Sequence, residues 1–275
     1  MDNAKLSALK TTAARVRLGI LEGVHAAASG HPGGSLSIAD IITYLYFSEM
    51  KVDPKDPKAA DRDRLVLSKG HTAPALYAVL AEKGFLPRED LKTLRQADSY
   101  LQGHPDMKHT PGVDMSTGSL GMGVSAACGM ALAAKIDGKD YRTYAIVGDG
   151  ESEEGQVWEA AMFASHYHLD NLCFILDLNG LQIDGPITEV MNPTPHDEKF
   201  RAFGFNVLEA DAHDFESLEA AFTAARKYKG KPSVIIAHSV KGKGVSFMEN
   251  QVGWHGTAPN DEQYAAAVAE IKASM

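Results

Sequence analysis

Two short stretches of this sequence place oxygen-bearing side chains where they could do chemistry together. Asp149 follows the apolar run YAIV within Gly148-Asp149-Gly150, and Asn179 ends the apolar run LCFILDL, with residues 151–178 between the two motifs. That interval accommodates one crossover helix, so both runs are expected to be neighbouring parallel strands whose carboxyl ends lie side by side. A carboxylate paired with a carboxamide suits Mg²⁺ or Ca²⁺ rather than zinc.

The glycines beside Asp149 add a second property to this expected site. They would let a diphosphate approach the backbone, and the N-terminus of the helix expected from residue 154 would add partial positive charge. Taken alone, Gly-Asp-Gly is more typical of an ordinary tight turn than of a binding site. Together with Asn179, however, it predicts a site for Mg²⁺ that also binds phosphate oxygens.

Histidines form the second group of candidate residues. Four of the eleven lie next to a glycine in irregular segments, whereas His25, His166 and His168 fall within expected helices. A loop position favours function, although each histidine alone could be an ordinary hydrogen-bonded residue. The four candidates are His31, His71, His104 and His255.

The elements that must position these residues follow an alternating strand and helix pattern. Several strands are continuously apolar, as expected when helices cover both faces of a parallel sheet. The pattern therefore predicts an α/β fold with a mostly parallel sheet. Strands are expected over 64–67, 142–147, 172–178, 205–209 and 233–237, and helices over 6–28, 36–50, 73–84, 120–136, 154–169, 195–203, 215–228 and 260–273.

The whole chain, 1–275, is expected to form a single domain. Residues 1–63 would be a helical elaboration, about 64–240 the α/β core, and 241–275 a closing loop and helix. The irregular segment 98–119 is long for a loop inside a compact domain, and such loops are usually functional.

Composition and charge exclude several classes of function. The 275 residues include 36 acidic and 27 basic side chains, a formal net charge of −9, which is the wrong sign for a nucleic-acid-binding or membrane-binding protein. An anionic ligand must therefore be held by a local group of cations or hydrogen-bond donors. The two cysteines, Cys128 and Cys173, lie in apolar sequence and are expected to be core residues of a cytoplasmic enzyme.

Beyond these separate motifs, the sequence resembles the N-terminal half of transketolases. A strand ending in Gly-Asp-Gly, followed about thirty residues later by a strand ending in Asn, is similar to the thiamine-diphosphate-binding fingerprint of that family. Seven stretches carry the resemblance in the family's order: SGHPGGSLSIAD (29–40), LSKGHTAPALYAVLAEKG (67–84), GHPD with PGVDMSTGSLGMG (103–123), GDGESEEGQVWEA (148–160), LDLNGLQIDG (176–185), KGKGVS (241–246) and WHGTAP (254–259).

This resemblance implies a thiamine-diphosphate-binding fold and a role for each matching residue toward the cofactor. Mg²⁺, with Ca²⁺ or Mn²⁺ as substitutes, would be held by the side chains of Asp149 and Asn179 and by the backbone carbonyl of Leu181, where the family often has isoleucine. The other implied cofactor contacts are His71, Gly118, Ser119, Leu120, Gly150, Glu154, Lys241 and His255.

The same resemblance implies which side chains take part in catalysis. His31, His104 and His255 would contact substrate oxygens, and His71 would lie nearer the diphosphate and the reacting carbon. Glu154 would serve in a proton relay between paired cofactors. A glutamate in the first turn of a helix is equally explained as a favourable partner of the helix dipole.

The family also implies a partner. A glutamate that activates the aminopyrimidine of the cofactor lies on a pyrimidine-binding domain, which is not found in this sequence. The expected function is therefore the N-terminal subunit of a split, heteromeric transketolase, inactive alone, with two copies of each chain. It would transfer a two-carbon ketol unit from a ketose phosphate to an aldose, as in the pentose phosphate pathway. A fragment of a longer chain is the simpler alternative.

Other functions remain open on the sequence alone. The chain could be half of another thiamine-diphosphate carboligase or the α chain of a 2-oxoacid dehydrogenase, which need not share the four histidines. It could also be a non-catalytic cofactor-binding protein, but retention of the metal ligands and histidines disfavours that interpretation. A nucleotide-binding module is disfavoured because GxGxxG is absent and Gly-Asp-Gly is followed by the acidic run ESEE.

Overall fold

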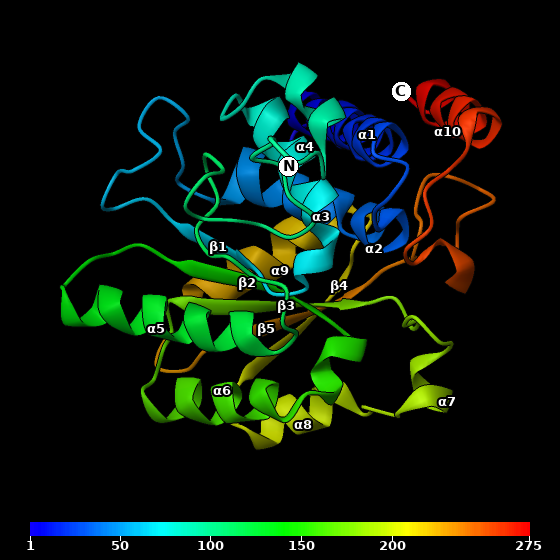
Figure 1. Cartoon of the computed structure of the whole chain (residues 1–275). Helices are drawn as coiled ribbons and strands as arrows, with labels where there is room; N and C mark the ends of the chain where they lie inside the picture. The colour runs from blue at the N-terminus through cyan, green and yellow to red at the C-terminus, as the bar shows by residue number, and fades with distance from the viewer.

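Five parallel strands form the centre of the structure (Figure 1). A computed structural model describes residues 1–275. The strand order across the sheet is β1-β2-β3-β5-β4, and every neighbouring pair is parallel, which confirms the predicted α/β class. The strands are β1 (Arg64–Leu67), β2 (Thr143–Gly148), β3 (Leu172–Leu178), β4 (Asn206–Asp211) and β5 (Ser233–His238).

Helices cover both faces of this sheet (Figure 1). One layer contains α1, α3, α4 and α9, and the opposite layer contains α5, α6 and α8. The helices are α1 (Asn3–Ala26), α2 (Pro32–Ser37), α3 (Ala39–Tyr44), α4 (Ala73–Lys83), α5 (Met122–Ile136), α6 (Gly155–His166), α7 (Ile187–Val190), α8 (His196–Ala202), α9 (Phe215–Lys227) and α10 (Asp261–Ala273). Short 3₁₀ turns are η2 (Gly70–Thr72), η3 (Arg88–Thr93), η4 (Gly150–Glu153) and η5 (Val252–Trp254).

The two layers explain why the strands are apolar without alternation. Successive residues of β2 point to opposite faces, so Tyr144 and Ile146 join the core beneath α1 and α9, while Ala145 and Val147 join the core beneath α5 and α6. Helices cover both faces, so the residues along the middle of the strand are apolar on both sides.

The predicted helix over 36–50 is wrong in its boundaries. The structure has α2, α3 and a π-helical turn, η1 (Leu45–Glu49), with a break at Ile38. Helical structure begins earlier than expected, at Pro32, because proline suits the first helical position. The two glycines after it allow close packing: a Cβ on Gly33 would lie 2.8 Å from the carbonyl oxygen of Trp254.

Other predicted boundaries differ by one to three residues, and two of these differences lie beside the expected cofactor site. Helix α5 begins at Met122 rather than residue 120, since Gly121 takes a left-handed conformation before it. Helix α6 begins at Gly155, so Glu154 is its N-cap residue rather than part of its first turn. Both changes lengthen the loops that border the expected cofactor site.

Both cysteines are core residues, as predicted. Cys128 is packed in the layer of α5 and α6, and Cys173 lies in the core on the other face of the sheet. Burial raises the pKa of each thiol to about 12. None of the helices combines the length and the apolar character that crossing a membrane would demand.

The start of α5 gives a test of this packing. A Cβ on Gly123 would lie 2.6 Å from the Ser68 hydroxyl oxygen and 2.7 Å from the Ser68 Cα, so Gly123→Ala forces α5 away from the end of β1. We expect it to lower the free energy of unfolding by about 1–3 kcal/mol in urea denaturation followed by circular dichroism.

Gly129→Ala in the same helix is the matched control. A Cβ there meets no atom within 4 Å, so the gain in helix propensity should raise stability by about 0.5–1 kcal/mol. Equal losses from both substitutions would contradict the packing argument.

Candidate functional site

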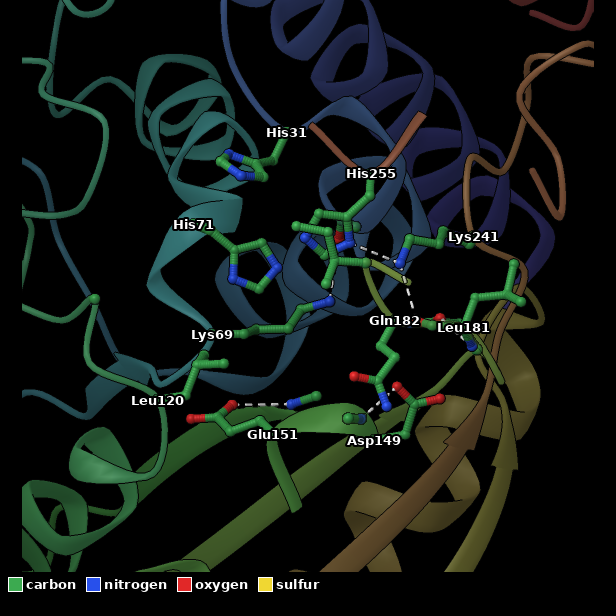
Figure 2. Close-up of a pocket in the computed structure, with 16 residues that line it drawn as sticks. His31, Lys69, His71, Leu120, Asp149, Glu151, Leu181, Gln182, Lys241 and His255 are labelled. Atoms are coloured by element: carbon green, nitrogen blue, oxygen red, sulfur yellow. Dashed lines mark hydrogen bonds between the residues drawn. The ribbon is translucent and has the colours of Figure 1, made fainter. Parts of the chain in front are cut away.

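A cavity lies at the carboxyl ends of the central strands, where an open parallel sheet is expected to bind ligands (Figure 2). Ten of the thirteen residues predicted from the sequence line it, and six further residues complete the lining. The predicted residues that line it are His31, His71, Gly118, Leu120, Asp149, Gly150, Asn179, Leu181, Lys241 and His255. The additional residues are Gly34, Lys69, Gly148, Glu151, Gln182 and Ile183.

Asp149 lies directly after β2 and is only 2% exposed. Its carboxylate accepts hydrogen bonds from the backbone N–H groups of Gly150, at 2.9 Å, and Gly180. Burial and the neighbouring Asp177 carboxylate nevertheless raise the pKa of Asp149 to about 6. A bound cation would reverse this shift by favouring the charged carboxylate.

The oxygens of Asn179 and Leu181 lie on the adjoining loop after β3. The Asn179 side-chain oxygen accepts from the Leu181 N–H at 3.1 Å, and the Leu181 carbonyl accepts from the Lys241 ammonium at 2.9 Å. Each oxygen keeps a second lone pair for a further partner.

The donor set fits a hard divalent cation. One carboxylate, one carboxamide and one carbonyl are all oxygen ligands, as Mg²⁺ and Ca²⁺ prefer, with phosphate and water to complete the coordination. No group of three or more His, Cys, Asp or Glu side chains in the chain is arranged to hold a metal ion.

Three of the predicted histidines form a cluster opposite Asp149 (Figure 2). The ring centroids of His31, His71 and His255 are 5.1 to 5.5 Å apart. Burial and Arg95 lower the pKa of His31 to about 4, and burial and Lys241 lower that of His255 to about 3. These imidazoles are therefore neutral at pH 7, and each can both donate and accept a proton.

Two atoms of this cluster bear directly on ligand binding. The His31 Nδ1 atom is buried and has no hydrogen-bond partner in the protein. The His255 Nδ1 atom lies 3.0 Å from the Lys241 ammonium, whose pKa is lowered to about 8 by burial and by Lys69. Because this His31 nitrogen is covered by the protein, the ring meets the cavity through its other atoms.

The remaining predicted residues are placed outside the cavity lining. His104 is exposed and lies behind Gly118, where a Cβ would come within 3.1 Å of its ring. Gly118 itself has φ +156°, a conformation that favours glycine. Ser119 is exposed at the surface of the same loop, beside the cavity residue Leu120.

Glu154 is also outside the lining. It is exposed, it caps α6 without a side-chain hydrogen bond to the helix, and its Cβ would be 3.0 Å from a Cβ on Gly121. The structure does not bring it to the histidines or to Asp149, and its role as a proton relay stays a prediction.

Sequence reasoning missed Glu151, which belongs to the acidic run ESEE that appeared unfavourable for a phosphate ligand. Its carboxylate is 3% exposed and accepts from the N–H groups of Gly121, at 2.9 Å, and Gly148, at 3.0 Å, as well as from the Ser68 hydroxyl. Glu151 therefore ties the turn after β2 to the start of α5.

Lys69 and Asp177 were also given no role from the sequence, although both lie within matching motifs. They form an ion pair, and both side chains are almost fully buried. Burial raises the pKa of the Asp177 carboxyl, but the Lys69 ammonium and the hydroxyls of Ser239 and Ser37 together hold that pKa below its usual value. Lys69 lies in the matching motif Lys-Gly-His, and Asp177 lies two residues before Asn179. These positions were the only indication in the sequence that the two residues belong to the site.

Comparison with known proteins identifies the family. Residues 9–273 match the family described as transketolase, thiamine diphosphate binding domain. The chain belongs to the transketolase family. This membership confirms the predicted thiamine-diphosphate-binding fold and the assignment to a transketolase-type enzyme.

Two similar relatives are separate transketolase subunits. The chain is 49% identical over 243 residues to the 6-deoxy-6-sulfo-D-fructose transketolase subunit SqwG of Clostridium sp. (strain MSTE9), covering 88% of each chain. It is 44% identical to an apulose-4-phosphate transketolase subunit of Phocaeicola vulgatus, covering 97% of this chain and 95% of that one.

Single-chain transketolases are matched over part of their length. Human transketolase is 45% identical over 256 residues, which are 93% of this chain but 40% of the human protein. The structure superimposes on transketolase from Leishmania mexicana with a TM-score of 0.90 and 35% identity, covering 96% of this chain and 41% of that one. Transketolase from Campylobacter jejuni gives the same TM-score and identity, with coverages of 99% and 43%.

The raised pKa of Asp149 predicts a pH-dependent effect on stability. Because its folded pKa of about 6 lies above the unfolded value of about 3.9, its contribution to folding is complete below pH 4 and is lost as pH rises through 6. In the cofactor-free chain, Asp149→Asn should therefore raise the free energy of unfolding by about 1–2 kcal/mol at pH 7.5 and by much less at pH 4.

Urea unfolding at the two pH values measures this difference. Asp98→Asn, which removes an exposed carboxylate, is the control and should change stability little at either pH. A gain from Asp149→Asn that is equal at both pH values would contradict the desolvation argument.

Proposed function

We propose that this chain is the diphosphate-binding subunit of a heteromeric, thiamine-diphosphate-dependent transketolase, active only with a partner chain that carries the pyrimidine-binding domain. It transfers a two-carbon ketol unit from a ketose to an aldose acceptor. Residues 1–275 act as one domain of an assembly with two copies of each chain, located in the cytoplasm.

One observation carries the requirement for a partner. The only carboxylates that line the cavity are Asp149 and Glu151. Asp149 is the proposed metal ligand, and Glu151 already accepts from two backbone N–H groups and the Ser68 hydroxyl, so neither is available to act on the aminopyrimidine. The glutamate that the family uses for this step is therefore expected from another chain.

The proposed cofactor site uses residues that already converge. Asp149, Asn179 and the Leu181 carbonyl would hold Mg²⁺, and Gly150 would allow the diphosphate to approach the start of η4. Lys241 and His71 would neutralise and bind phosphate oxygens, and Gly118 with Leu120 would border the aminopyrimidine side. Bound thiamine diphosphate would supply the carbanion chemistry that the side chains lack.

The histidines would act on the sugar. Neutral imidazoles can donate to the substrate's carbonyl oxygen and later accept a proton from its hydroxyl groups. His31 and His255, which both line the cavity, are the nearest candidates, and Lys241 holds His255 in place. His104, behind Gly118, would contact a substrate that extends further toward the surface.

The relatives suggest which sugars to test. The names of the two separate-subunit relatives specify a sulfonated ketose and a phosphorylated one, so both substrates carry an anionic group. We infer that this chain also serves a ketose bearing a terminal phosphate or sulfonate.

Coupled assays of ketol transfer test this function. The chain with Mg²⁺ and thiamine diphosphate should be inactive alone and active after co-expression with a chain carrying the pyrimidine-binding domain. The substrates to compare are xylulose 5-phosphate and 6-deoxy-6-sulfofructose, each with an aldose phosphate acceptor. Asp149→Ala should lower the activity of the complex at least 100-fold, since it removes the only charged metal ligand.

Asp197→Ala, a partly exposed position in the first turn of α8, is the control and should retain activity. Full activity of the chain alone would overturn the requirement for a partner. Full activity of the Asp149→Ala complex would overturn the metal site.

A further inference from the structure

The carboxylate of Asp177, one residue before the end of β3, is fully buried and accepts four hydrogen bonds. Its Oδ2 atom accepts from the Ser37 hydroxyl at 2.7 Å, from the Asn179 side-chain amide at 2.9 Å and from the Lys69 ammonium. Its Oδ1 atom accepts from the Ser239 hydroxyl. The Asp177 carboxylate thus acts as the acceptor in all four of these hydrogen bonds.

These donors belong to four segments that surround the cavity. Ser37 ends α2, Lys69 precedes η2, Asn179 follows β3, and Ser239 follows β5. Lys69 also donates to the Gly34 carbonyl at 3.1 Å. Asp177 itself does not line the cavity, so it can affect a ligand there through its charge and through the residues that it holds, but not by direct contact.

The contact with Asn179 matters most because an amide has two different ends. The nitrogen donates and the oxygen accepts, and rotation by 180° exchanges them. The Asp177 carboxylate can only accept, so it holds the amide nitrogen and leaves the Asn179 oxygen toward Leu181 and the cavity. Without an acceptor at residue 177, the amide could rotate and present its N–H₂ group, which repels a cation.

We propose that Asp177 is a positioning residue that fixes the orientation of the Asn179 amide, so that its oxygen is available to the divalent cation. Lys69 balances the buried charge of Asp177 and keeps it in place. This inference rests on the proposed metal site, because it assigns Asn179 as a ligand. It adds a residue that no ligand contact would reveal.

The test compares two variants that differ in whether residue 177 offers Asn179 a hydrogen-bond acceptor. Asp177→Leu alone would leave Lys69 buried without a partner, so both variants also carry Lys69→Met, which removes the unpaired charge and preserves the fold. In Asp177→Asn/Lys69→Met the new amide oxygen can still accept from Asn179. In Asp177→Leu/Lys69→Met, residue 177 has no oxygen that could accept from Asn179.

Binding of Mn²⁺ is measured by electron paramagnetic resonance on the full chain, co-purified with its partner and saturated with thiamine diphosphate. We expect the Leu variant to bind Mn²⁺ about 10- to 100-fold more weakly than the Asn variant, the usual effect of losing a group that orients a metal ligand. A merely structural role would lower the melting temperature without separating the two affinities.

Two controls separate the possible failures. Asp63→Leu removes another buried carboxylate, which accepts from two backbone N–H groups near the opposite end of the sheet, and should leave Mn²⁺ affinity unchanged. Asn179→Ala should weaken Mn²⁺ binding. Equal affinity of the Leu and Asn variants, with weakened binding in Asn179→Ala, would overturn the positioning role alone. Unchanged binding in Asn179→Ala would overturn the metal site and this inference with it.

Discussion

Buried charge at the carboxyl edge of the sheet is the constraint on which the rest of the structure depends. Asp149, Glu151 and Asp177 are at most 3% exposed, and so are Lys69 and Lys241. Three carboxylates against two ammonium groups leave a formal surplus of one negative charge among buried side chains, which is costly unless each group is paired or hydrogen-bonded. The glycine-rich turns supply the N–H groups, and the loops after β1 and β5 supply the lysines.

Much of the fold could be predicted from the sequence, because the physical signals were local. Continuously apolar strands indicated a sheet covered on both faces, and the interval between Asp149 and Asn179 indicated one crossover. The helical elaboration was harder to predict. Helix α2 contains proline and two glycines, which are local turn signals, and it forms because those glycines pack closely against Trp254 and Thr72. Tertiary contact decided the conformation there.

The site was predictable where a motif supplied the residue, and less so where long-range contacts did. Ser68 and Glu151 are 83 residues apart in the sequence, and Lys69 and Asp177 are 108 apart, yet each pair meets in the structure. The spacing of these residues along the chain does not predict that they form pairs. Conversely, Glu154 lies within a matching motif, but the isolated chain leaves it exposed at the N-terminus of α6.

The reactivity of the two buried cysteines depends on which layer of helices opens. Only the thiolate reacts readily with alkylating reagents, and burial keeps both thiols protonated and covered while the fold is closed. Cys128 becomes reactive when the layer of α5 and α6 separates from the sheet, whereas Cys173 requires the opposite layer to open. The relative labelling rates of the two positions therefore distinguish local opening of one layer from unfolding of the whole chain.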